Sequence, residues 1–215
     1  MIDLHTHTTF SDGVLIPAES ARRAKVAGYA AMAFTDHADA SNLELILANV
    51  SRVAKAYGPY LGIDLFCGVE LTHVPPGLIP GLVQQARSLG AQIVVVHGQT
   101  VVEPVEEGAN LAAIEAGCDI LAHPGLITPQ EARLAAEKGV YLEITTRKGH
   151  SLTNGHVAAL ARQFGARLVI NNDAHEPGDF VSRALRRAVA LGAGLSEEEY
   201  SAAEANSREI LRNIP

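Results

Sequence analysis

The chain has 215 residues, of which 47% are hydrophobic and 19% are charged, and its formal net charge is −7. This length fits one domain with a substantial core, and the acidic balance argues against broad nucleic-acid binding, which needs a basic surface. No run of about 18 consecutive apolar residues occurs, so no membrane-spanning helix is expected. The N-terminus has no basic and apolar signal-peptide pattern, so the cytoplasm is the expected compartment.

A short apolar run, a polar loop and an amphipathic helical pattern recur along the chain. Runs such as Val94–Val96 and Leu168–Ile170 are apolar on both faces, as parallel strands covered by helices are. Seven repeats predict an α/β fold, with residues 1–215 forming one distorted, TIM-like (β/α)7 barrel of parallel strands. The predicted strands are Met1–Leu4, Tyr29–Phe34, Leu61–Val69, Ile93–Val96, Asp119–Ala122, Val140–Ile144 and Arg167–Ile170.

Proline and glycine mark the ends of the helical patterns between these runs, as is typical of helix termini. The Gly58-Pro59 pair predicts that the second helix ends at Tyr57, and Thr128 is a predicted N-cap. The predicted helices are Pro17–Ala27, Leu43–Tyr57, Pro80–Leu89, Pro129–Lys138, Leu152–Phe164 and Val181–Leu191, with one or two more in Ser196–Ile214.

Residue types that bind metal ions follow six of the seven predicted strands. His5 and His7 are two residues apart, so both can face one cation from the same side of a strand. Catalytic groups of such barrels gather at the carboxyl ends of the strands, where these side chains are expected to meet. Nine candidates are too many for one tetrahedral ion, but they suit two or three ions with Glu70 bridging. The candidates are His5, His7, Asp12, His37, Glu70, His97, His123, Asp173 and His175.

A single histidine after an apolar run is more often a hydrogen-bonded core residue than a metal ligand. Six of the nine histidines, however, fall at strand ends together with three carboxylates. Chance placement does not account for the set, so a shared metal centre is the favoured interpretation.

The loop after the sixth predicted strand contains cations in place of a carboxylate. Arg147 offers a two-pronged donor and Lys148 a point charge, which together suit a phosphate group. The alternative interpretation is a solvated loop with ordinary surface charges. His150 in the same loop and His73 after the third strand are further candidates for substrate contact.

These residues resemble the four motifs of the PHP (polymerase and histidinol phosphatase) family, in the right order and over nearly the whole chain. The residues that carry the resemblance are Asp3–His7 with Ser11–Gly13, Thr35–His37, Glu70, His97, Ala122–Gly125 and Asn172–His175.

The resemblance implies a distorted seven-stranded barrel with a three-metal site. Some relatives carry histidine at the position of Asp12. The expected assignment places His5, His7, Glu70 and Asp173 on the first ion, Glu70, His97 and His123 on the second, and Asp12, His37 and His175 on the third.

Stand-alone members of the family imply a metal-dependent phosphoesterase similar to histidinol-phosphate phosphatase. The prediction is hydrolysis of a small phosphomonoester, histidinol phosphate-like or a nucleotide, by a hydroxide held between two of the zinc, manganese or iron ions. Catalytic roles are expected for Asp173, Glu70 and His37. The proton donor to the leaving group is left open among Asp36, His73 and His150. A small phosphorylated substrate is the expected partner, without a membrane and without a stable nucleic-acid complex.

Three alternatives remain. A phosphodiesterase or nuclease of the same family would need a basic groove that this acidic sequence lacks. A two-metal amidohydrolase typically uses a metal-bridging lysine, which has no counterpart at the third or fourth predicted strand. A non-catalytic metal-binding module would have no need of so many ligands around an open cavity.

Overall fold

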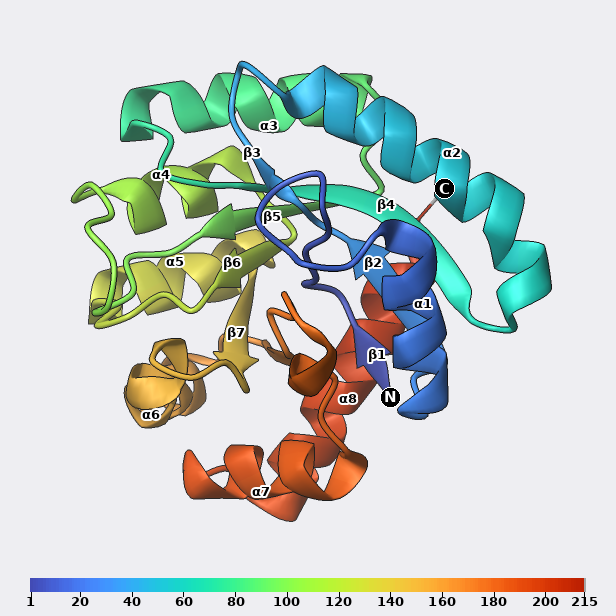
Figure 1. Ribbon diagram of the computed structural model, residues 1–215. Helices are drawn as coiled ribbons and strands as arrows, with labels where there is room; N and C mark the ends of the chain where they lie inside the picture. Colours follow the sequence, from blue (N-terminus) through green and yellow to red (C-terminus); the bar gives the residue numbers. More distant parts are fainter. Residues whose placement is uncertain (215) are drawn as a thin grey trace.

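A computed structural model describes residues 1–214 and shows parallel strands surrounded by helices (Figure 1). Seven strands pair in the order β1-β2-β4-β5-β6-β7-β8, every pair is parallel, and the short β3 pairs with β4. The predicted barrel class is therefore confirmed, and each predicted run overlaps one strand; only β3 was not predicted. The strands are β1 (Ile2–Asp3), β2 (Ala31–Phe34), β3 (His37–Ala38), β4 (Asp64–Leu71), β5 (Ile93–His97), β6 (Ile120–Ala122), β7 (Tyr141–Thr145) and β8 (Leu168–Asn171).

The helices follow the predicted pattern with two differences. The prediction for the second helix is wrong, because α2 continues through Gly58 and Pro59 and ends where Gly62 adopts a left-handed conformation. An alanine-rich helix, α4, was missed because it has no clear polar face. The helices are α1 (Pro17–Val26), α2 (Leu43–Leu61), α3 (Ile79–Ser88), α4 (Ala109–Ala116), α5 (Pro129–Lys138), α6 (Asn154–Phe164), α7 (Arg183–Gly192) and α8 (Glu197–Arg212), with short 3-10 turns at Pro76–Leu78, His150–Thr153 and Pro177–Asp179.

The barrel is nearly closed where β1 meets β8. An isolated parallel bridge joins Thr6 to Ala174, and the Leu4 backbone N–H donates to the Asn171 side chain at 2.9 Å. Helix α8 packs against both strands along this seam (Figure 1). A single backbone bridge, a side-chain hydrogen bond and a helix thus take the place of a longer hydrogen-bonded ladder here.

Alternate side chains of the strands fill the barrel interior. Ile93 and Val95 of β5 belong to this inner core, as does Val169 of β8. Because side chains alternate along a strand, the same faces continue to His97 and Asp173 at the carboxyl ends. Strand periodicity therefore aims polar groups into the barrel mouth. A larger apolar layer separates the sheet from the surrounding helices.

None of the helices in residues 1–214 is both long enough and apolar enough to span a bilayer.

Candidate metal centre

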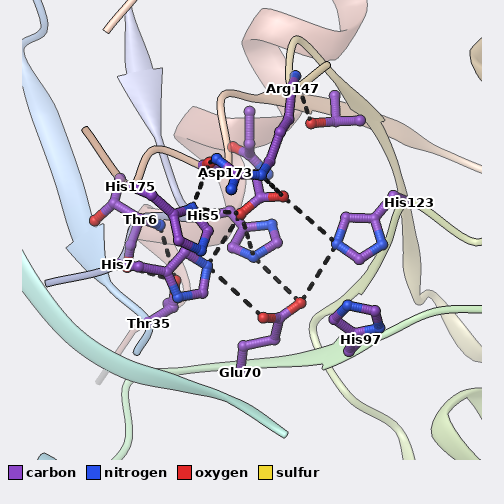
Figure 2. A network of polar contacts seen from close by, with 12 residues as sticks. His5, Thr6, His7, Thr35, Glu70, His97, His123, Arg147, Asp173 and His175 are labelled. Atoms are coloured by element: carbon purple, nitrogen blue, oxygen red, sulfur yellow. Dashed lines mark hydrogen bonds and ion pairs between the residues drawn. The ribbon is translucent and has the colours of Figure 1, made fainter. Parts of the chain in front are cut away.

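All nine predicted ligands meet in one cluster at the carboxyl ends of the strands. Figure 2 labels seven of them, without Asp12 and His37. At its buried centre, His5 Nε2 lies 3.2 Å from Glu70 Oε1, and His7 Nε2 lies 3.1 Å from Asp173 Oδ1. These four side chains are the set that the family resemblance assigns to the first ion.

The other two predicted sets flank this centre. Glu70, His97 and His123 each offer a ligand atom within 4.8 Å of the others, so Glu70 belongs to two sets. On the solvent side, Asp12 Oδ1 lies 3.1 Å from His175 Nε2 and 3.4 Å from His37 Nε2. The side chain of Asp12 is 59% exposed, which makes this the most open of the three positions.

Hydrogen bonds fix several of the imidazole rings. The Nδ1 atom of His5 lies 2.9 Å from Glu143 Oε1, and those of His97 and His175 lie 3.0 Å from the carbonyl oxygens of Gly98 and Asp173. Because these oxygens only accept hydrogen bonds, each Nδ1 carries the proton. Each Nε2 is therefore directed toward the carboxylates of the centre, and it becomes the ligand atom when a metal ion replaces its proton.

Several buried polar atoms of the centre have no hydrogen-bond partner. A buried polar atom without a partner costs about 1–3 kcal/mol, so a group of them indicates a missing ligand. Divalent cations would satisfy the carboxylate oxygens and one nitrogen of each imidazole, and a mixed imidazole and carboxylate set suits zinc, iron or manganese. The atoms are His5 Nε2, both ring nitrogens of His7, Glu70 Oε1, His123 Nδ1 and Asp173 Oδ1.

Burial and charge set the protonation states of the centre. Burial and neighbouring imidazoles lower the pKa of His7 and of His123 well below the usual value, so both rings are neutral. Burial disfavours the charged form of Glu70, but the positive charges of His5 and His37 outweigh it and hold its pKa well below the usual range. Neutral imidazoles beside a charged carboxylate are the forms that bind metal ions.

The backbone of the centre includes uncommon conformations and a close approach of two loops. His123 and Asp173 have positive φ angles of 27° and 53°, which cost non-glycine residues free energy and often occur at functional sites. A Cβ atom on Gly125 would lie 1.8 Å from the carbonyl oxygen of Gln99. Glycine at this position therefore lets the loops after β5 and β6 pack together.

Of the predicted substrate-binding residues, Arg147 and His150 reach the centre. Arg147 Nε lies 3.5 Å from Asp173 Oδ2, and the buried His150 ring stacks on His123 with 4.2 Å between centroids. Lys148 is exposed and forms no ion pair within residues 1–214. His73 lies at the rim.

Asp36, a predicted candidate for the leaving-group acid, lies behind the ligands. Its carboxylate accepts hydrogen bonds from the Thr8 backbone N–H at 2.6 Å and from the hydroxyls of Thr8 and Ser11. These bonds brace the loop after β1. Asp36 is therefore engaged in holding that loop, and His73 and His150 are the remaining candidates.

The sequence interpretation missed two carboxylates. Glu143 is fully buried, and its carboxylate lies within hydrogen-bond distance of His5 Nδ1. Tyr141, two residues earlier, lies on the inner face of β7, so the alternation of side chains points Glu143 into the barrel as well. Glu103 lies in the loop after β5, with Oε2 only 3.0 Å from His97 Nε2. No periodic signal marks Glu103, because its position depends on the path of the loop.

The sequence relatives of the chain include proteins that align with most of its length. An uncharacterized protein of Methanocaldococcus jannaschii is 49% identical over 199 residues, covering 92% of this chain and 91% of that protein. Ribonuclease P protein component 3 of Methanosarcina mazei is 29% identical over 205 residues, covering 87% of this chain and 79% of that protein.

Solved structures share the fold at low sequence identity. A protein of Listeria monocytogenes, named as a candidate histidinol phosphatase, superposes with a TM-score of 0.60 at 14% identity, covering 83% of this chain and 97% of the other. A zinc-bound amidohydrolase of Burkholderia ambifaria gives 0.58 at 11% identity, covering 93% and 70%. Residues 3–121, over half of the chain, match the PHP domain. The protein therefore belongs to the PHP family.

Proposed function

We propose that the protein is a metal-dependent phosphoesterase that hydrolyses small phosphomonoesters. The observation that carries this proposal is a dense imidazole and carboxylate centre with only two cationic side chains in the surrounding loops. Of the 17 lysines and arginines in the chain, only Arg147 and Lys148 lie in the loops between a strand and the next helix. Two cations and a metal centre suit one phosphate group, whereas a long nucleic acid requires many phosphate contacts.

The residues around the centre have distinct proposed roles. Divalent cations, when bound, would lower the pKa of water and neutralise phosphate charge. Arg147 would donate to the equatorial phosphate oxygens from its place beside Asp173. The imidazole of His150, with Nε2 3.9 Å from Asp173 Oδ2, lies where it could donate a proton to the leaving oxygen. Asp173 and Glu70, with His37, would hold the reacting groups in place.

The direct test is hydrolysis by metal-loaded protein of matched phosphomonoesters and phosphodiesters. Asp173→Asn should keep the fold and lose at least about 100-fold in turnover, because the carboxylate that lies beside His5, His7 and His123 is neutralised. Wild-type turnover in that variant, or no hydrolysis of any monoester by the loaded wild type, would refute the proposal.

Arg147→Ala tests the phosphate contact. Loss of a charge-assisted hydrogen bond worth about 1.5–3 kcal/mol should raise KM by roughly tenfold or more. Arg22→Ala, an exposed change on α1 with the same loss of charge, is the control and should leave KM unchanged. Equal KM values for the two variants would remove Arg147 from the phosphate site.

A second candidate is a phosphodiesterase acting on nucleotides or nucleic-acid ends. The likeness to ribonuclease P protein component 3 favours it, and the same substrate comparison decides between the two. An amidohydrolase activity is less favoured despite the shared barrel, because no strand in residues 1–214 contains a lysine that could bridge two metals.

A further inference from the structure

Glu103 joins three histidines at the rim of the metal centre. Its Oε2 atom lies 3.0 Å from His97 Nε2 and 3.2 Å from His73 Nε2, and its Oε1 atom lies 3.4 Å from His150 Nε2. Neither Glu103 nor His73 is among the nine ligands expected for the family. A carboxylate from the loop after β5 is thus held beside side chains from the loops after β4 and β7.

The contact between His97 and Glu103 has the geometry of two ligands on one ion. His97 Nδ1 donates to the Gly98 carbonyl oxygen, so in the neutral ring Nε2 presents a lone pair to the carboxylate. A proton on Nε2 or a cation must lie between these two atoms, which are 3.0 Å apart, and a divalent cation can take the place of that proton. Two ligands that are each about 2.1 Å from one cation lie roughly 3.0–3.4 Å apart. The separation between His7 and Asp173 in the inner centre, 3.1 Å, is of the same size.

The backbone of His73 is an independent indication that its side chain has a role. Within residues 1–214, the non-glycine residues with positive φ are His73, at 52°, and the two inner ligand candidates His123 and Asp173. Such a conformation costs about 1–3 kcal/mol. Burial does not explain it, because the side chain of His73 is 44% exposed. In this conformation the imidazole lies within 3.2 Å of Glu103.

His97 belongs to two groups of ligand atoms. The inner group consists of Glu70, His97 and His123, and the outer group consists of His73, His97 and Glu103; within each group the atoms lie within 4.8 Å of one another. One nitrogen lone pair binds one ion at a time, so the groups are alternative positions for an ion. Exposure falls from 44% and 35% at His73 and Glu103 to zero at Glu70.

We propose that His73, Glu103 and His97 form an outer site for a divalent transition-metal ion, through which metal enters and leaves the inner centre. Two imidazoles and one carboxylate leave coordination positions open, as an exchanging site requires. The ion would bind first at the exposed pair and then move inward, with His97 as the ligand common to both positions. The inference rests on the metal centre of the proposed function.

The test is the rate of Co²⁺ exchange in the full-length protein, followed by Co²⁺ absorption and not by activity. Metal-free protein is mixed with Co²⁺ to measure uptake, and loaded protein is mixed with excess chelator to measure loss. Glu103→Gln removes the charge, and His73→Asn removes the imidazole but tolerates positive φ. Glu107→Gln, an exposed change in the same loop, is the matched control.

Both site variants should slow uptake and loss by about tenfold, the lower end of the effect of removing a supporting group from a metal site. The final spectrum of the inner ions should be unchanged, and Glu107→Gln should match the wild type. Rates in Glu103→Gln and His73→Asn equal to those of the control would overturn the proposal, as would loss of inner-site affinity without a change in rate. Circular dichroism verifies the fold of each variant. Failure of loaded wild-type protein to hydrolyse phosphate esters would refute only the proposed function.

Discussion

Replacing Glu143 with glutamine tests whether the side chains behind the ligands hold the metal centre in place. The buried carboxylate accepts from His5 Nδ1 at 2.9 Å and from the Asn171 side chain at 2.8 Å through Oε1. Oε2 accepts from the backbone N–H of His123 at 3.1 Å. All three partners are donors, so either orientation of the new amide places an NH2 group against at least one of them.

The expected cost has two parts. One buried donor without a partner lowers the free energy of unfolding of the metal-free protein by about 1–3 kcal/mol. Loss of the charge beside His5 also makes its Nε2 a weaker ligand, so affinity for divalent metal should fall by about 10–100-fold. That range corresponds to about 1.4–2.7 kcal/mol of binding free energy.

Urea unfolding in the presence of chelator measures the first part, and competition with a chromophoric chelator for Zn²⁺ measures the second. Glu137→Gln on α5 makes the same charge change at an exposed position and should alter neither quantity. Wild-type zinc affinity in a folded Glu143→Gln protein would show that Glu143 does not support the ligands.

Three further predictions concern the scaffold. Arg186→Met removes the guanidinium that pairs with buried Glu204 at 2.6 Å. It should lower the free energy of unfolding by about 3–5 kcal/mol, because a buried carboxylate loses its partner. Adding Glu204→Leu should restore much of this stability, and a double variant as unstable as Arg186→Met alone would contradict the explanation. Gly125→Ala should lower the free energy of unfolding, measured in urea, by more than about 3 kcal/mol. Gly125 has a positive φ, and an added Cβ would overlap the carbonyl oxygen of Gln99. Wild-type stability of this variant would show that the two loops can separate. The hydrogen bonds from Arg162 lower the pKa of Glu199 from 4.5 to about 2, so the carboxylate contributes stability that is present above pH 4.5 and is lost as the pH falls toward 2. In thermal unfolding at pH 7, the wild type should therefore be more stable than Glu199→Gln, by less than about 1 kcal/mol because the pair is exposed. The difference should disappear near pH 2. A difference that stays constant with pH would exclude the ion pair with Arg162 as its cause.

Much of the fold and of the centre follows from local patterns. Apolar runs such as Val94–Val96 and the glycines after helices predict the alternation of strand and helix, and the rule that functional groups lie at the carboxyl ends of strands predicts that His5 and Asp173 meet. The bounds of α5 were predicted because Thr128 and Gly139 supply strong capping signals.

The remaining features depend on tertiary contacts. The left-handed residue Gly62, not Pro59, ends α2. Glu143 was missed because it lies within β7 and not at its carboxyl end, although its position on the inner face of the strand could have identified it. Glu103 depends on a loop whose path is fixed by a hydrogen bond from the Gln99 backbone N–H to the Asn110 side chain at 2.9 Å. Such a contact leaves no periodic pattern in the sequence.

The central claim is that side chains distant in the sequence hold shared divalent cations. The most direct measurement is the number of zinc, iron and manganese ions per chain, determined by elemental analysis of folded protein purified without chelator. Two or three tightly bound ions per chain are expected, since the buried unpartnered atoms of His5, Glu70 and Asp173 require them. Folded protein that retains no ion, and takes up none when metal is supplied at micromolar concentration, would contradict the claim.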